Sequence, residues 1–135
     1  MESQTHIDLV NITIEYIKDM VSEENCSFIY ADTAGNNNAV KIIGNYIPDV
    51  YYCYNRKLVI GEAKTINDFE RPHSKEQFVA YMNEFSLFEG ECTLVVSVPW
   101  QLVKTAKNYF RQLRCKMHVD VQVVILNETS RSFFV

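Results

Sequence analysis

Three segments of the chain carry apolar residues at spacings of three and four, which predicts amphipathic helices. The segments cover residues 5–21, 74–88 and 101–117. The apolar stripe of the first is Ile7, Val10, Ile14, Ile17 and Val21. The apolar side of the second is Phe78, Tyr81, Met82 and Phe85. Thr5 and Asp8 resemble a capping box, so we expect the first helix to begin there.

Short runs rich in β-branched and aromatic residues predict strands between these helices. The runs cover residues 27–30, 46–54, 57–65, 93–98 and 119–126. Asn55-Arg56 marks a turn between the second and third runs, and the composition of residues 34–38 predicts a loop. The order α-β-β-β-α-β-α-β predicts one α/β domain over residues 1–135, with a mixed central β-sheet flanked by helices.

The composition fits a packed domain and excludes several other classes of protein. Of 135 residues, 47% are hydrophobic and 22% are charged, so the chain is neither a disordered tail nor a linker. Its purely apolar runs are only a few residues long, so we expect no membrane span. Residues 1–4 lack the layout of a secretion signal, so we expect a reducing compartment, the cytoplasm.

Cysteines and histidines are scattered along the chain. The four cysteines are Cys26, Cys53, Cys92 and Cys115. Because they include no Cys-x-x-Cys pair, we expect buried free thiols rather than a zinc site. The three histidines, His6, His73 and His118, are also too far apart to predict a local ligand set.

Charge is distributed unevenly. The net charge of −4 argues against bulk attraction to nucleic acid, but residues 92–119 contain no Asp or Glu. Cations recur in that segment at spacings of three, four and three, at Lys104, Lys107, Arg111 and Arg114. On a helix these four residues form a basic stripe. The stripe either follows a phosphate backbone or is only a solvated face.

Residues 47–65 predict a hairpin that brings reactive groups together. If the chain turns at Asn55-Arg56, Asp49 lies opposite Glu62, and directly opposed residues share a face. Lys64 is two residues beyond Glu62 and projects from the same face. The hairpin therefore gathers two carboxylates and an ammonium at the end of strands that are otherwise apolar.

Two carboxylates this close repel one another unless a cation lies between them. Oxygen ligands of this kind suit Mg²⁺ or Mn²⁺, which stabilise charge on a phosphodiester and activate a coordinated water. Lys64 would then orient the water or bind the scissile phosphate. The alternative is an ion pair between Asp49 and Lys64 with Glu62 solvated. The apolar strand around Glu62, and Pro48 at the strand start, favour the metal.

Pro48-Asp49 followed by Glu62-Ala63-Lys64 resembles the PD-(D/E)XK motif of the restriction-endonuclease-like nuclease superfamily. The element order α-β-β-β-α-β is similar to the common core of that superfamily. The resemblance implies a metal-dependent phosphodiesterase of restriction-endonuclease-like fold, with Asp49 and Glu62 as metal ligands. It also implies a metal contact from the Ala63 carbonyl and a catalytic role for Lys64.

Further residues match positions that many members of this superfamily share. Gln77, with Tyr81 one turn later, resembles a pair on the helix after the lysine strand. The alternative is that Gln77 closes a capping box with Ser74 and that Tyr81 is core. Glu15 resembles a first-helix Glu that lies near the metal, with a solvated acid as the alternative.

Three polar residues lie in the segment between Lys64 and the second helix. Asp68, Arg71 and His73 either border a substrate groove or belong to an ordinary polar loop. We expect Arg71, His73 and the basic stripe to contact nucleic acid.

The hairpin residues and the resemblance together imply a Mg²⁺- or Mn²⁺-dependent nuclease that hydrolyses phosphodiester bonds, with DNA favoured over RNA. Two alternatives stay open. One is a catalytically silent domain of the same fold that binds nucleic acid or protein, and the other is a nuclease subunit of a larger complex. A homodimer is expected if both strands of a duplex must be cut.

Overall fold

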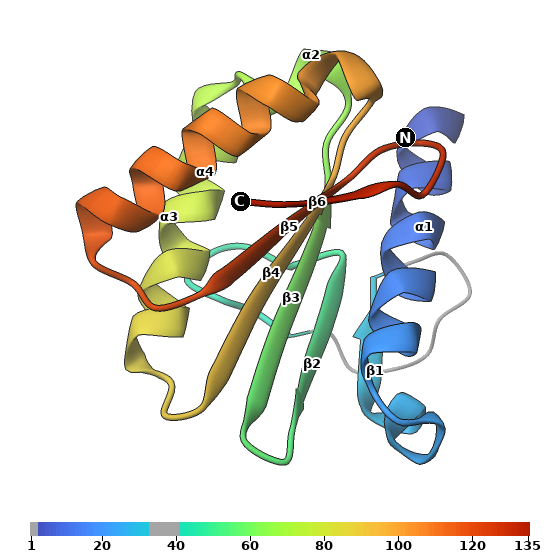
Figure 1. Ribbon diagram of the computed structural model, residues 1–135, viewed down its shortest axis with the longest axis vertical. Coiled ribbons are helices and arrows are strands. Elements are labelled where there is room, and N and C mark those ends of the chain that lie inside the picture. The colour runs from blue at the N-terminus through green and yellow to red at the C-terminus, as the bar shows by residue number, and fades with distance from the viewer. Residues whose placement is uncertain (1–2, 33–40) are drawn as a thin grey trace.

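The computed structural model describes residues 3–32 and 41–135 (Figure 1). Its helices are α1 (Gln4–Met20), α2 (Ile66–Phe69), α3 (Pro72–Leu87) and α4 (Val103–Met117), with short 3₁₀ helices η1 (Glu23–Phe28) and η2 (Trp100–Leu102). Its strands are β1 (Ile29–Ala31), β2 (Val50–Tyr54), β3 (Lys57–Ala63), β4 (Glu91–Ser97), β5 (Gln122–Leu126) and β6 (Ser132–Phe134). The predicted loop at residues 34–38 lies outside the described residues.

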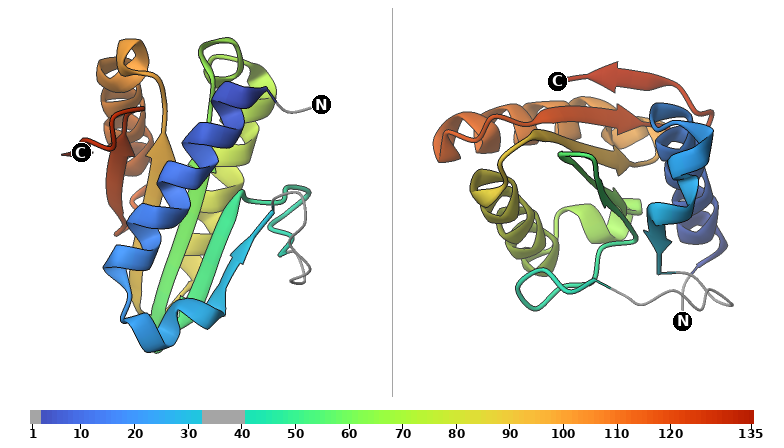
Figure 2. Two further views of the ribbon diagram at one scale, coloured as in Figure 1. Left: turned by 90° about the vertical axis from the view of Figure 1, so that its right-hand side faces the viewer. Right: turned by 90° about the horizontal axis from the view of Figure 1, so that it is seen from below.

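The six strands form one open mixed sheet in the order β1-β2-β3-β4-β5-β6. The pairs β3-β4 and β4-β5 are parallel, and the other three pairs are antiparallel. The connections from β3 to β4 and from β4 to β5 each move one strand along the sheet in the same direction. Because crossovers between parallel strands are right-handed, their helices lie on the same face of the sheet. Accordingly α3 and α4 cover one face of the sheet and α1 covers the other (Figure 2). The predicted mixed sheet with flanking helices is confirmed.

The β2–β3 hairpin has the predicted register. Tyr54 pairs with Lys57, and the ladder continues to Val50 opposite Gly61. Asn55 and Arg56 both have positive φ, at 54° and 62°, as a two-residue type I′ turn requires. The turn therefore determines which residues oppose one another at the far end of the hairpin.

Helix α1 packs closely against β3. Its buried residues are Leu9, Val10, Thr13 and Ile17. A Cβ on Gly61 would lie 2.6 Å from Thr13 Cγ2, so only glycine permits this approach. The apolar stripe predicted for this helix is partly wrong, because Ile7 is 36% exposed. The predicted capping box at Thr5 is also wrong, because Ser3 is the N-cap and its Oγ accepts from the His6 N–H at 3.1 Å.

The opposite face of the sheet carries the larger core. The predicted apolar side of the second helix is confirmed, because Phe78, Tyr81, Met82 and Phe85 are all buried on α3. They pack with Leu58 and Ile60 of β3 and with Phe110 of α4. The positions of β3 that face α3 and α4 thus lie in an apolar layer.

One α-helix and one strand were not predicted, in addition to the 3₁₀ helix η1. Helix α2 is a single turn, held by Phe69, which is fully buried against Phe78 and Phe110. Strand β6 has three residues and pairs with β5 after a turn in which Asn127 Oδ1 accepts from the Thr129 and Arg131 N–H groups. Both depend on contacts with distant parts of the chain, which a periodic pattern does not report.

Two further predictions, on the cysteines and on the strand at residues 46–54, are confirmed only in part. Cys92 is buried, but Cys53 and Cys115 are exposed, so the expectation that the free thiols are buried holds only in part. The predicted strand at residues 46–54 begins only at Val50. Among the described residues, no helix is long and apolar enough to cross a bilayer.

Candidate functional site

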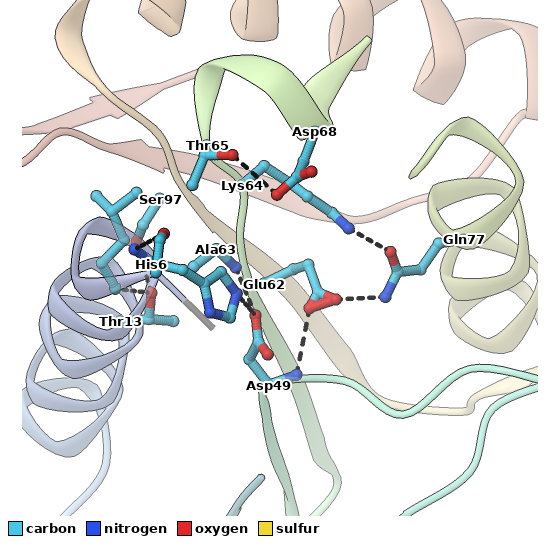
Figure 3. Close-up of polar contacts among 12 residues, drawn as sticks. His6, Thr13, Asp49, Glu62, Ala63, Lys64, Thr65, Asp68, Gln77 and Ser97 are labelled. Atoms are coloured by element: carbon cyan, nitrogen blue, oxygen red, sulfur yellow. Dashed lines mark hydrogen bonds and ion pairs between the residues drawn. The ribbon is translucent and has the colours of Figure 1, made fainter. Parts of the chain in front are cut away.

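The predicted pair Asp49 and Glu62 lies at the carboxyl end of β3 (Figure 3). The Asp49 backbone N–H donates to Glu62 Oε2 at 3.2 Å, and the Ala63 N–H donates to Asp49 Oδ2 at 2.9 Å. Both acidic residues are nearly inaccessible, with exposures of 8% for Asp49 and 2% for Glu62. The hairpin register therefore brings the two carboxylates into one buried site, as the sequence predicts.

The pairing of β2 explains why Asp49 is positioned here. Strand β3 runs two residues past Gly61, where its pairing with β2 stops. The Asp49 carboxylate takes the place of the missing partner for the Ala63 N–H. Within a strand, the N–H and C=O of one residue point to the same side. The Ala63 carbonyl is therefore directed toward the side where Asp49 lies.

Lys64 and Glu62 are joined through the side chain of Gln77 on α3. Lys64 Nζ donates to Gln77 Oε1 at 2.6 Å, and Gln77 Nε2 donates to Glu62 Oε1. Tyr81, one turn later on α3, donates its hydroxyl hydrogen to the same Glu62 oxygen at 3.1 Å. We call Asp49, Glu62, Lys64, Gln77 and Tyr81 the Glu62 cluster.

The capping alternative for Gln77 is wrong. The N-cap of α3 is Arg71, and the Ser74 hydroxyl donates to the Asp68 carbonyl at 2.6 Å rather than forming a box with Gln77. Gln77 is 5% exposed and directed into the Glu62 cluster. Its amide offers an oxygen to the ammonium and a nitrogen to the carboxylate, so one residue holds both charged groups.

Burial gives the Glu62 cluster an unusual electrostatic state. Desolvation raises the pKa of Glu62 well above its ordinary value, and the nearby Asp49 carboxylate raises it further, while Lys64 lowers it. Burial likewise raises the pKa of the Tyr81 hydroxyl, with a further contribution from Glu62. Ionising Glu62 beside Asp49 is therefore unfavourable with Lys64 as the only nearby ammonium, and a bound cation would make it more favourable.

His6 belongs to the site although the sequence reasoning left it out. Its Nε2 lies 3.5 Å from Asp49 Oδ2, and it reaches the site from the first turn of α1. His6 precedes Val10 by four residues and Thr13 by seven, so it shares their sheet-facing side. That spacing indicates a sheet-facing His6, but the three histidines are too scattered along the chain to predict a common site.

Two hydroxyls position α1 beneath the site. Thr13 Oγ1 and Ser97 Oγ lie 2.6 Å apart, and both residues are fully buried. The Ser97 carbonyl accepts from the Lys64 N–H at 2.9 Å. This contact links the end of β4, the middle of α1 and the backbone of the lysine in one arrangement.

Glu15 does not join the cluster. Its side chain is 72% exposed and lies 3.7 Å from Lys18 on the solvent side of α1. It follows His6 by nine residues, which is about 13 Å along the helix axis. The expectation that Glu15 lies near the metal is wrong, and His6 is the α1 side chain that reaches Asp49.

An open pocket of about 610 Å³ lies next to His6, the residue that contacts Asp49, although no residue of the Glu62 cluster lines it. His6 and Thr65 line it, and so do Asp68 and Arg71, two of the three residues predicted to border a groove. Asp68 accepts from the Thr65 hydroxyl at 2.8 Å. His73 lies elsewhere, edge-on to Tyr46 with ring centroids 5.3 Å apart, so its predicted place beside the groove is wrong.

The basic stripe on α4 divides into two parts. Lys104 and Arg111 are exposed and Lys107 is half-buried, as a surface contact requires. Arg114 instead donates to the carbonyls of Val121 at 3.2 Å and Val135 at 2.9 Å. The prediction that Arg114 contacts nucleic acid is therefore not supported, because its guanidinium ties α4 to the strands beside it.

The groups that could hold a metal are oxygen donors. No group of three or more His, Cys, Asp or Glu side chains in the described ranges could bind an ion by itself. Two carboxylates and a backbone carbonyl are nevertheless a donor set that fits Mg²⁺ or Mn²⁺, which retain several waters and take further oxygens from substrate. Asp49, Glu62 and the Ala63 carbonyl form that set.

Comparisons of the chain with models of protein families, with curated proteins and with solved structures found no match. The functional interpretation therefore rests on the chemistry of the residues.

Proposed function

We propose that the chain is a Mg²⁺- or Mn²⁺-dependent nuclease of restriction-endonuclease-like fold that hydrolyses phosphodiester bonds, with DNA favoured over RNA. The observation that carries the proposal is the Glu62 cluster, in which a buried lysine lies beside two buried carboxylates at a strand end. Buried charges are rare unless they are paired or bind a metal. The superfamily that the motif resembles has the common core order α-β-β-β-α-β. The same order is found here in α1, β1, β2, β3, α3 and β4.

The roles of the chain's own residues follow from their contacts. Asp49, Glu62 and the Ala63 carbonyl would hold the ion, which supplies charge stabilisation for the phosphodiester and an activated water. Lys64 would orient that water or bind the scissile phosphate. Gln77 would fix the position of the Lys64 ammonium for either role, through the 2.6 Å hydrogen bond.

A specific observation also supports the silent alternative. Glu62 accepts hydrogen bonds from the Asp49 N–H, Gln77 and Tyr81, so its oxygens are satisfied by protein donors alone. A buried polar network whose hydrogen bonds are all satisfied can have a purely structural role, which is to specify one arrangement of the core. A test of function must therefore separate chemistry from folding.

The decisive experiment incubates plasmid, linear duplex, single-stranded DNA, branched DNA and RNA with Mg²⁺, Mn²⁺ or EDTA. The parent should cut at least one substrate with metal and none with EDTA. Lys64→Ala should reduce the rate by about 100- to 1000-fold, the loss expected for one preorganised electrostatic donor. Lys57→Ala is the matched control, since Lys57 lies at the other end of the same strand.

Circular dichroism and melting temperature should show Lys64→Ala to be folded. Equal rates for Lys64→Ala and the parent would remove Lys64 from the mechanism. A parent that cuts none of the substrates in either metal would favour the silent domain.

A further inference from the structure

Pro99 and Trp100 join two hollows at the carboxyl end of β4. Pro99 lines the 610 Å³ pocket that His6 and Thr65 also line, and Trp100 lines a second hollow of about 490 Å³ on α4. The lining of this second hollow includes Trp100, Lys104, Lys107, Arg111 and Phe133. We call it the α4 hollow. One residue step along the chain thus connects the pocket at His6 to the exposed part of the basic stripe.

Trp100 presents an aromatic face from a fixed backbone. The residue is 65% exposed, which is unusual for so large an apolar side chain. Its backbone N–H is held by both carboxylate oxygens of Glu128, at 3.2 and 3.1 Å. An exposed ring on an anchored backbone is a platform on which a flat ligand can stack.

Cations surround a second aromatic ring in the same hollow. Lys107 Nζ lies 6.0 Å from the centroid of the Phe133 ring, and the guanidinium carbon of Arg131 lies 5.6 Å from it. Lys104 and Arg111 are exposed beside them. Within the described part of the chain, Lys104, Lys107 and Arg111 form no ion pair with an acid.

We infer that the α4 hollow binds a single-stranded nucleic acid segment, with a base stacked on Trp100 and phosphates against Lys104, Lys107 and Arg111. Aromatic rings and cations that line one hollow suit an unpaired strand, which presents base faces for stacking and phosphates for charge contacts. A duplex does not fit equally well, because its bases are stacked on each other and their faces are hidden. The inference rests on the proposed function, since Pro99 and Trp100 would guide the strand between the hollow and the cluster.

Binding is measured in EDTA, by fluorescence anisotropy with labelled oligo(dT), oligo(rU) and a duplex, each of about 15 nucleotides or base pairs. Trp100→Ala should weaken binding of the single strands by about ten-fold, with a much smaller effect on the duplex. Trp100→Phe should retain most of the affinity. Phe134→Ala is the matched control, because Phe134 is 60% exposed on β6 and does not line the hollow.

Salt dependence tests the cations. Each lost phosphate contact on a single strand lowers the slope of log affinity against log salt by about 0.7. The double variant Lys107→Gln/Arg111→Gln should therefore lose about 1.4 from the slope, so its deficit relative to the parent shrinks about sevenfold between 50 and 200 mM salt. Lys18→Gln/Lys116→Gln removes the same charge from exposed positions outside the hollow and should leave the slope nearly unchanged.

The outcomes distinguish this inference from the proposed function. Single-strand binding that falls in Trp100→Ala and in the double variant supports the hollow, whether or not metal produces cleavage. Cleavage in Mg²⁺ with unchanged binding by both variants overturns the inference and leaves the nuclease proposal intact. Tighter binding of oligo(rU) than of oligo(dT) would assign the strand to RNA. For Trp100→Ala, we expect weaker binding of the single strands than in the parent and nearly equal binding of the duplex.

Discussion

The Glu62 cluster and the α4 hollow both gather charged side chains, but they differ in burial and in hydrogen bonding. In the cluster, Lys64 is 9% exposed and its ammonium is held by Gln77 at 2.6 Å. In the hollow, Lys104 and Arg111 are exposed and form no ion pair with another described residue. A buried charge acts through a fixed geometry in low dielectric, whereas an exposed charge acts through a field that salt screens.

Because of that difference, different measurements test the two regions. A change in the cluster should alter reaction rate, metal response and pH dependence. A change in the hollow should alter affinity and its dependence on salt.

Gln77→Ala should have the largest effect after the loss of Lys64 itself. It leaves the buried ammonium and Glu62 without their shared partner, so we expect cleavage to fall by about 10- to 100-fold, as when an outer-shell partner is removed. Asn83→Ala is the matched control, because Asn83 is an exposed amide on the same helix. Specific activity at the parent level in a destabilised Gln77→Ala protein would make Gln77 purely structural.

Glu62→Gln should change the pH dependence of stability. Because the folded-state pKa of Glu62 is raised above its ordinary value of 4.5, its favourable contribution is complete below that pH and is lost as pH rises through the folded pKa. The free energy of unfolding in EDTA should therefore fall between pH 5 and pH 8 in the parent more than in Glu62→Gln. Urea titrations at four pH values measure both slopes, and parallel curves would contradict the prediction.

Asp49→Ala should abolish stabilisation by metal. At Mn²⁺ concentrations about ten times the Kd, the parent should melt about 4 °C higher than in EDTA, by mass action on the folded state. Asp120→Ala, an exposed acid just before β5, should respond as the parent does. A rise of equal size in Asp49→Ala would place the ion elsewhere.

Arg114→Ala and Arg111→Ala should separate the two parts of the basic stripe. Arg114 donates to two backbone carbonyls, so its loss should lower the free energy of unfolding by about 1.5 kcal/mol. Arg111 is exposed, and its loss should change stability by no more than about 0.5 kcal/mol. Chemical denaturation measures both, and equal effects would mean that the contacts of Arg114 are not maintained in solution.

Local sequence predicted the part of the site that a single hairpin builds. The turn at Asn55-Arg56 and the period-two alternation of the strands placed Asp49 opposite Glu62, and the ladder up to Val50 and Gly61 has that register. Gln77 was identified differently, through the resemblance to the nuclease superfamily, and its side chain donates to the Tyr81 hydroxyl one turn later on α3. Residues close in sequence have few ways to meet, so spacing alone predicts their contacts.

Contacts between distant segments were decided only by the tertiary structure. His6 reaches Asp49 because Gly61 lets α1 lie against β3, and no pattern within residues 4–20 reports the residue that faces it across the sheet. Arg114 looked equivalent to Arg111 on a helical wheel, yet the carbonyl of Val135 makes it a structural residue. Periodicity determines which side of an element a residue occupies, but packing of the whole chain determines what lies on that side.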